Sequence, residues 1–376
     1  MNVPFVDLHA QYLSIKPEID AAIAEVIAES AFVRGRHVEA FEKAWAKTIG
    51  LKHCISCGNG TDALYISMRA LSVKPGDEVI TTAHSWISTS ETITQAGGRV
   101  VFCDTDYETF TIDPAQIEAK ITSATVGIIP VHLYGQPADM GPIMEIARKH
   151  NLWVIEDCAQ AHLATYKGRP VGTFGNIATF SFYPGKNLGA YGDAGCIVTN
   201  DERLAEWMGA FARHGGKNEH IMEGMCSRMD GLQAAILNAK LPHLPTWIQV
   251  RRRVAASYDE RLNDIGDIVT PKVGPARDHV YHLYVIRTEK RDALRKRLTD
   301  VGIATVLNYP KALPFYPAYT HLGHTAADFP VAHANQSSIL SLPIYPEMSE
   351  EMIDFVANQI EGFFQVPATL AVTSAR

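Results

Sequence analysis

One lysine stands alone among small, aromatic and glycine residues in the run 179–195, TFSFYPGKNLGAYGDAG. Lys186 has no acidic residue immediately beside it, and a lysine in a desolvated pocket loses pKa and becomes nucleophilic. Schiff-base chemistry with a carbonyl compound requires such an amine. The glycines would let the backbone approach a planar group closely. The alternative interpretation is a tight hairpin whose lysine reaches solvent.

Two adjacent carboxylates end an apolar run at 153–160, WVIEDCAQ. Ligands of open α/β sheets bind at the carboxyl ends of the strands, which is where Glu156 and Asp157 fall. A carboxylate buried there needs a cation or hydrogen-bond donors to stay ionised. That partner is either a cation of the protein or a cation of a ligand, and the sequence leaves both open.

Two further runs follow predicted strands. Residues 58–62, GNGTD, lead into a helix, and the N–H groups of a helix N-terminus together with a hydroxyl suit a phosphate. Plain N-capping by Thr61 is the alternative. Trp86 follows the strand predicted at 78–82 and would place an aromatic plane at another strand end. Because a buried tryptophan is usually part of a core, Trp86 alone indicates little.

Short β-rich runs alternate with helical patterns between residues 50 and 200, which predicts a mostly parallel sheet covered by helices. The predicted strands are residues 53–57, 78–82, 100–103, 126–131, 153–155, 178–182 and 196–199. The predicted helices between them include residues 61–71, 88–96, 114–121 and 142–150, the third capped by Asp113.

The pattern changes after about residue 240. A long polar helix is predicted around 247–262, a strand at 281–287, a helix at 291–301 and a final amphipathic helix near 349–364. We therefore expect a large α/β domain over residues 1–240 and a smaller α+β domain over residues 241–376.

Composition excludes several classes of protein. The 376 residues include 34 basic and 41 acidic side chains, and 47% are hydrophobic, which excludes a disordered chain and a coiled coil. Without a long basic run, nucleic acid and anionic membranes are not expected partners. The six scattered cysteines form neither a disulfide framework nor a complete metal-ligand pattern, so we expect no metal. No signal peptide or membrane span is visible, which favours a cytoplasmic protein.

The four runs share one predicted geometry, because each lies at the carboxyl end of a strand or in the loop after it. A nucleophilic lysine, a carboxylate, a phosphate seat and a flat aromatic residue together describe a pyridoxal phosphate site. That cofactor needs a lysine for its aldehyde, a carboxylate for its pyridine nitrogen and donors for its phosphate.

The chain also resembles the sugar aminotransferases of the DegT/StrS group, which are pyridoxal phosphate enzymes of fold type I. The resemblance runs nearly end to end. It is carried by residues 4–8 (PFVDL), 59–64 (NGTDAL), 75–79 (PGDEV), 130–136 (PVHLYGQ), 155–160 (IEDCAQ), 180–187 (FSFYPGKN), 227–235 (SRMDGLQAA) and 341–345 (SLPIY). It implies a mostly parallel central sheet flanked by helices, with a smaller C-terminal domain.

The resemblance also implies roles for individual residues. Lys186 would form the Schiff base with the cofactor and later carry the transferred proton, and Asp157 would bind the pyridine nitrogen. The remaining cofactor contacts would be Gln160 at the ring hydroxyl, Trp86 against the ring face, and Gly60, Thr61 and Ser181 at the phosphate. The segment at 224–230 reaches the neighbouring subunit's site in the family, which implies a homodimer with shared active sites.

Two positions depart from the family pattern. Cys226 stands where relatives commonly have an asparagine that binds the partner subunit's cofactor phosphate, and a thiol is a poor donor. Asn218 is a possible replacement. Arg228 matches the arginine that would meet the amino donor's carboxylate, with an interface salt bridge as the alternative. Asn308 stands where relatives often have histidine, in a loop expected to face the sugar.

The activity that the resemblance implies is amine transfer from glutamate to a nucleotide-linked keto-sugar by a ping-pong mechanism, in deoxyamino-sugar biosynthesis. The run 183–195 favours amination at C3 of a dTDP-linked 3-keto-6-deoxyhexose. Alternatives are amination at C4, another keto-sugar or a cyclitol as acceptor, and a regulator that binds the cofactor or a sugar nucleotide without turnover. The relatives that are dehydratases replace the lysine with histidine, so Lys186 argues against that activity.

Overall fold

The computed structural model describes residues 1–216 and 219–365. Its α-helices are α1 (Leu8–Ser14), α2 (Lys16–Glu29), α3 (Arg36–Ile49), α4 (Gly60–Ala70), α5 (Ser88–Gln95), α6 (Pro114–Ile117), α7 (Met140–Lys149), α8 (Glu202–Phe211), α9 (Gly231–Lys240), α10 (Leu244–Leu262), α11 (Arg291–Asp300), α12 (Pro330–Ser338) and α13 (Glu350–Gln365). Its strands are β1 (His53–Cys57), β2 (Glu78–Thr82), β3 (Arg99–Cys103), β4 (Thr125–Ile129), β5 (Trp153–Asp157), β6 (Thr165–Tyr166), β7 (Arg169–Pro170), β8 (Ile177–Ser181), β9 (Gly195–Thr199), β10 (Arg277–Asp278), β11 (Tyr284–Arg287) and β12 (Ile339–Leu342).

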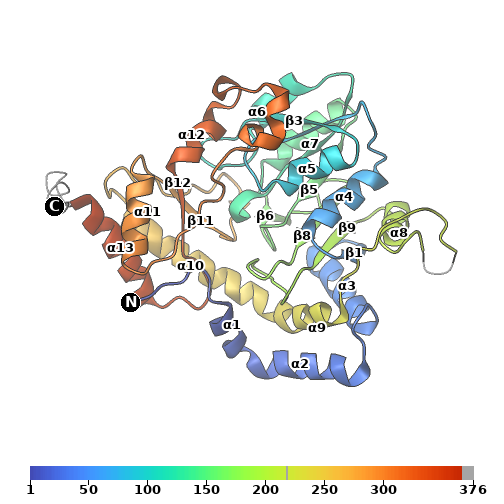
Figure 1. Ribbon diagram of the computed structural model, residues 1–376, viewed down its shortest axis with the longest axis horizontal. Coiled ribbons are helices and arrows are strands. Elements are labelled where there is room, and N and C mark those ends of the chain that lie inside the picture. The colour runs from blue at the N-terminus through green and yellow to red at the C-terminus, as the bar shows by residue number, and fades with distance from the viewer. Residues whose placement is uncertain (217–218, 366–376) are drawn as a thin grey trace.

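A seven-stranded sheet forms the centre of the molecule (Figure 1), in the order β1-β9-β8-β5-β4-β2-β3. Neighbouring strands are parallel except at β9, which runs antiparallel to both β1 and β8. All seven strands predicted between residues 50 and 200 are present, so the prediction of a mostly parallel sheet is confirmed. Its strands read as nearly continuous apolar runs because helices cover both faces.

The two faces of the sheet are buried by different helices. On one face, α4, α5 and α8 pack over the side chains of Ile55, Ile155 and Ile197. On the other face, α3 and α9 pack over β8 and β9, and α6 and α7 cover β4 and β5. The period-two alternation along each strand therefore divides the apolar side chains between two cores.

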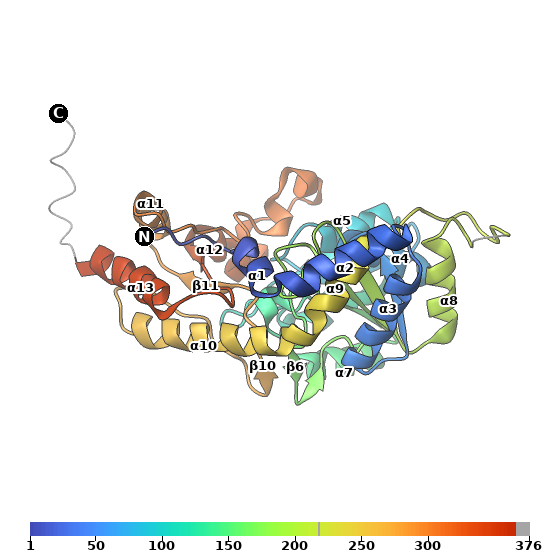
Figure 2. The same cartoon turned by 90° about the horizontal axis from the view of Figure 1, so that it is seen from below.

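A second, smaller unit is formed by later parts of the chain. The antiparallel pair β11 and β12 packs with α10, α11 and α13 around its own core, and these elements lie together at the left of Figure 1. Figure 2 shows α10 at the left of the molecule and α9 next to it, toward the centre. The predicted elements at 247–262, 281–287, 291–301 and 349–364 correspond to α10, β11, α11 and α13.

Packing crosses the predicted domain boundary at residue 240 in both directions. Val3 lies in the core of the C-terminal unit and pairs with Ile303, whereas Leu313 and Phe329 pack into the core beneath α4 and α5. The division of the chain into residues 1–240 and 241–376 stays a prediction, and residues 366–376 lie outside the described part. Within the described ranges, no helix has both the length and the apolar character needed to cross a membrane.

Candidate active site

The predicted site residues meet at the carboxyl edge of the central sheet. β5 ends at Asp157, β8 ends at Ser181 and leads into the loop that carries Lys186, and β1 leads into α4. The start of α4 touches the end of β8 so closely that a Cβ on Gly60 would lie 2.7 Å from the Cβ of Ser181. Glycine is therefore needed at position 60 for α4 to approach this edge.

The loop carrying Lys186 is closed by its own backbone. Phe182 N donates to Ala194 O at 2.8 Å, and the Phe182 carbonyl accepts from Ala190 N, also at 2.8 Å. Burial lowers the pKa of Lys186 to about 8, while the nearby Asp157 carboxylate favours the charged amine and opposes this shift. The loop folds back on itself, as the hairpin alternative predicted. However, the Lys186 amine is buried and does not reach solvent, and nucleophilic chemistry requires such a desolvated amine.

The two adjacent carboxylates have different surroundings. Glu156 is fully buried and accepts hydrogen bonds from the N–H groups of Gly172, Phe174 and Gly175 at 2.7–2.8 Å. Its Oε2 also lies 3.1 Å from His132 Nε2. Glu156 is therefore satisfied by the protein itself. The sequence left open a cation of the protein or a cation of a ligand as the partner of this pair, but the partners of Glu156 are three backbone N–H groups and His132.

Asp157 retains capacity for another partner. Its carboxylate accepts from Thr89 Oγ1 at 2.9 Å and from Ala159 N at 3.1 Å, and neither donor is a cation. Burial raises the pKa of Asp157 above its usual range, against the effect of these two donors and of Lys186. A cation at this carboxylate would offset the cost of burying it.

A group of possible metal ligands lies behind this carboxylate. Side-chain atoms of His132, Glu156 and Cys158 lie within 4.8 Å of one another, and all three residues are buried. However, His132 Nδ1 accepts from Ala138 N at 3.0 Å, and both oxygens of Glu156 are already hydrogen-bonded. The group is therefore explained as a structural network that supports the end of β5.

The N-terminus of α4 presents free donors to the site. Asn59 is the N-cap, and its Oδ1 accepts from Asp62 N at 2.8 Å, so capping by Thr61 is wrong. Among the described residues, no acceptor takes the N–H of Gly60 or of Thr61. Thr61 Oγ1 lies 2.7 Å from Ser88 Oγ. This arrangement leaves two N–H groups and adjacent hydroxyls for an anion.

Gln160 and Trp86 are linked by Tyr309, a residue that the sequence did not single out. Gln160 Oε1 accepts from Tyr134 N at 2.6 Å, and its Nε2 donates to Tyr309 Oη at 2.8 Å. The Tyr309 ring lies 5.6 Å from the ring of Trp86. Trp86 is 57% exposed, so it is not a core residue and its ring can cover a ligand.

Asn308 lies in the predicted loop, but its side chain points into the protein. Its Oδ1 accepts from Ser341 Oγ at 2.9 Å, and its carbonyl accepts from Tyr134 Oη. The next residue, Tyr309, donates its N–H to His84 Nε2 at 3.2 Å. Sequence reasoning missed Tyr309, Tyr134 and His84, although each lies within a motif that it quoted or beside a residue that it named.

The segment with Cys226 and Arg228 lies beside the start of α4. Ser227 Oγ accepts from Gly58 N at 2.9 Å and donates to Asp62 Oδ2 at 2.6 Å. Cys226 and Arg228 on either side of it are exposed. Their predicted roles toward a partner subunit stay predictions, and Asn218 lies outside the described residues.

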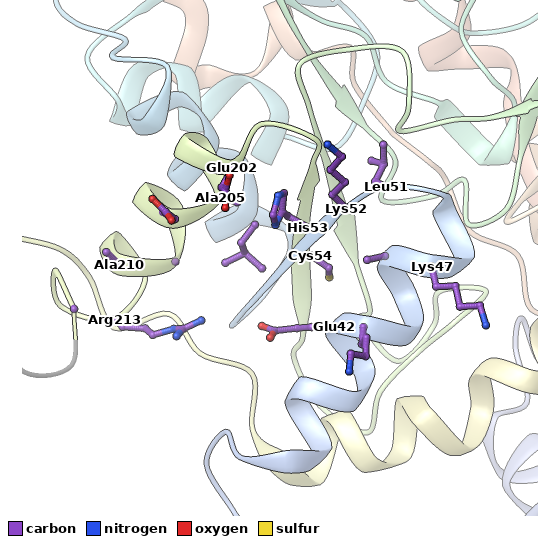
Figure 3. Close-up of a pocket in the computed structure, with 16 residues that line it drawn as sticks. Glu42, Lys47, Leu51, Lys52, His53, Cys54, Glu202, Ala205, Ala210 and Arg213 are labelled. Atoms are coloured by element: carbon purple, nitrogen blue, oxygen red, sulfur yellow. The ribbon is translucent and has the colours of Figure 1, made fainter.

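A separate pocket of about 810 Å³ lies between α3, β1 and α8 (Figure 3). Its lining includes Glu42, Lys52, His53, Cys54 and Arg213. None of the predicted site residues lines it, and its wall mixes acidic and basic side chains. We therefore place the candidate active site at the carboxyl edge of the sheet and not in this pocket.

Comparison with known proteins gives consistent matches. The model of the DegT/DnrJ/EryC1/StrS aminotransferase family matches residues 13–361. A Geobacillus stearothermophilus protein named pleiotropic regulatory protein is 48% identical over 369 residues, 97% of this chain and 99% of that protein. The dTDP-3-amino-3,4,6-trideoxy-alpha-D-glucose transaminase of Streptomyces venezuelae is 40% identical over 349 residues, 92% of each chain.

A solved structure is similarly close. S. venezuelae DesV, crystallised in complex with a ketimine intermediate, superposes with a TM-score of 0.95 and 38% sequence identity, over 97% of this chain and 99% of that chain. The agreement covers the central sheet and the C-terminal unit alike, and it confirms the predicted fold type. The chain therefore belongs to the DegT/DnrJ/EryC1/StrS aminotransferase family.

Proposed function

We propose that the protein transfers the amino group of glutamate to C3 of a nucleotide-linked keto-sugar, with pyridoxal phosphate bound at the site around Lys186. The observation that carries this proposal is the burial of the Lys186 amine near the Asp157 carboxylate, which forms no direct ion pair among the described residues and accepts from only two neutral donors. Relatives named as transaminases of dTDP-3-amino sugars support the sugar and the carbon.

The residues present fit this cofactor. Lys186 is a desolvated amine for its aldehyde, Asp157 is a buried carboxyl for its ring nitrogen, and the free N–H groups of Gly60 and Thr61 suit its phosphate. Trp86 offers an exposed ring face. When bound, the cofactor supplies an electron sink for breaking the α C–H bond of the amino donor.

The protein's own residues would bind, orient and move protons. Lys186 Nζ, with a pKa near 8, can release and take up a proton close to neutral pH. Asp157 would hold a proton at the ring nitrogen through a charge-assisted hydrogen bond in a water-poor position. Gln160, fixed by Tyr134 N and Tyr309 Oη, would orient the ring from its side.

The test is the visible spectrum of the protein loaded with pyridoxal phosphate, before and after glutamate. We expect the absorbance of the lysine-bound cofactor to disappear on glutamate addition and to return on addition of an accepted keto-sugar. Borohydride reduction followed by peptide mapping should place the cofactor on Lys186. A protein that takes up no cofactor, or whose spectrum glutamate leaves unchanged, contradicts the proposal.

The same test distinguishes an aminotransferase from a second candidate function, that of a regulator. The relative that is 48% identical is named a pleiotropic regulatory protein, and a regulator could bind the cofactor without turnover. Such a protein would keep its spectrum in glutamate. The nucleophilic environment of Lys186 favours turnover, and 2-oxoglutarate formation in stoichiometric amounts would exclude a role limited to binding.

We further propose a homodimer whose active sites are shared. Phe32, Val33 and Ile221 have exposed apolar side chains, which a subunit interface could bury. The exposed side chains of Cys226 and Arg228 flank a serine that is anchored at the start of α4. This places them near the proposed phosphate seat, where a second copy could exchange such contacts with the first.

Replacing Cys226 with asparagine tests this arrangement. An amide donor at a phosphate is expected to add about 1.5 kcal/mol, which corresponds to cofactor binding about tenfold tighter. Cofactor dissociation constants are measured by equilibrium titration of the cofactor-free proteins, with Cys226→Ala as the control that removes the thiol without adding a donor. An unchanged constant would mean that position 226 is not a phosphate ligand in this protein.

A further inference from the structure

A second lysine, Lys240, is buried at the C-terminal end of α9 and is 0% exposed. Its Nζ donates to the carbonyl of Gly189 at 2.8 Å and lies 4.3 Å from the centroid of the Tyr191 ring. Burial lowers the pKa of Lys240 to about 8, and the charge of Glu347 opposes this shift. A buried ammonium is costly, and a purely structural position could hold an apolar side chain of similar length.

The two groups that Lys240 contacts belong to the loop of Lys186. Gly189 lies where the loop turns back, since a Cβ there would lie 2.2 Å from Pro184 O. Tyr191 N donates to Gln233 Oε1 at 2.8 Å. Gln233 and Lys240 are seven residues apart on α9 and therefore lie on the same face of the helix. Helix α9 thus holds the returning limb of the loop at two points.

The environment of Lys240 differs from that of Lys186 in one respect that matters for chemistry. The Asp157 carboxylate acts on the amine of Lys186, whereas Lys240 faces a backbone carbonyl and an aromatic ring. The carboxylate that acts on Lys240 is that of Glu347 and not that of Asp157 at the end of β5. The contacts of Lys240 instead constrain the backbone three residues after Lys186.

We propose that Lys240 is a positioning residue for amine transfer, which holds the Gly189 carbonyl so that the loop presents the Lys186 amine to the reacting atoms. The proposal rests on the proposed role of Lys186. A displacement of about 1 Å in a reacting group lowers rates by about 100-fold, so a single anchor on this loop can have a large effect. Gln233 holds Tyr191 independently, so loss of Lys240 would loosen the loop without unfolding it.

The experiment compares three variants of the cofactor-loaded protein in the half-reaction with glutamate, followed as a single turnover. Here kcat is the maximal single-turnover rate constant, and KM is the glutamate concentration that gives half of it. Lys240→Met keeps the length of the side chain and removes its donor, and Lys240→Arg retains a donor. Leu298→Ala, in the fully buried core of the C-terminal unit, is the control for lost stability. We expect Lys240→Met to lower kcat by about 10- to 100-fold with KM within about threefold. We expect Lys240→Arg to recover most of the loss, and Leu298→Ala to stay within about twofold of the parent.

A merely structural role predicts another pattern. If Lys240→Met loses no more kcat than Leu298→Ala at a comparable decrease in Tm, the positioning role is wrong. If Lys240→Met does not yield folded protein, Lys240→Leu, which also lacks a donor, is measured against the same control and judged by the same criterion. Borohydride mapping of the parent protein distinguishes the two proposals, because a cofactor fixed to a lysine other than Lys186 overturns the role of Lys186 itself.

Discussion

Replacing Lys186 with alanine is expected to lower kcat for amine transfer by about 10⁴-fold or more. The reason is that one amine is proposed both to attach the cofactor and to carry the proton during transfer. Its pKa near 8 suits both tasks at neutral pH. The measurement is a single-turnover reaction with glutamate, in which substrate binding and chemistry are resolved separately.

The same variant should be more stable than the parent when the cofactor is absent. In the folded protein, burial lowers the pKa of this amine from the ordinary lysine value of 10.5 to about 8. Between about pH 8 and 10.5 the unfolded chain therefore binds more protons, and stability rises with pH. Below about pH 8 the folded protein holds the buried amine in its charged form, and this desolvated charge lowers the free energy of unfolding. Lys186→Ala removes the charge, so it should raise the free energy of unfolding of the cofactor-free protein at pH 7 by about 1–3 kcal/mol.

Two controls make the result specific. Lys52→Ala removes an exposed lysine in the separate pocket near β1 and should leave both kcat and stability close to those of the parent. Lys186→Arg keeps a cation that stays protonated and should be as inactive as the alanine variant. Near-normal turnover by either Lys186 variant would show that another group carries the chemistry.

The strand positions could be predicted from sequence because the central strands are buried on both faces. Such strands are short apolar runs separated by turns, and their carboxyl ends place Asp157 and the Lys186 loop at one edge. Helices α1, α2, α3, α8, α9 and α12, and strands β6, β7, β10 and β12, were not predicted. Strand β12 has only four residues and is defined by its pairing with β11, which no local pattern reveals.

The remaining site residues depend on contacts between distant parts of the chain. Tyr309 reaches Gln160 across 149 residues, and His84 accepts from Tyr309 N across 225. A tyrosine beside a proline or a histidine after a strand carries no local signal of such a contact. Lys240 was missed for a related reason, because a lysine within a helical segment is usually expected to lie in solvent.

Asp157→Asn is expected to lower the maximal single-turnover rate constant of the glutamate half-reaction by about 100- to 1000-fold while the fold is retained. The amide oxygen can still accept from Ala159 N, and the amide nitrogen can donate to Thr89 Oγ1, so both hydrogen-bond partners of the carboxylate in the parent protein can be retained. The amide carries no charge, however, so it cannot keep a proton on a ring nitrogen. Glu156→Gln is the matched control, because the neighbouring carboxylate is satisfied by backbone donors and its loss should act mainly on stability.

The same substitution should change the titration of Lys186 in a direction that the site geometry fixes. In the parent, burial lowers the pKa of the amine to about 8 and the Asp157 carboxylate limits that decrease. Removing the carboxylate leaves burial unopposed, so the pKa of Lys186 should fall further in the cofactor-free Asp157→Asn protein. Competitive labelling with acetic anhydride from pH 5 to 10, read at the Lys186 peptide, would show a lower midpoint for the variant and an unchanged one for Glu156→Gln. A midpoint that moves upward would mean that Asp157 does not act on the amine as proposed.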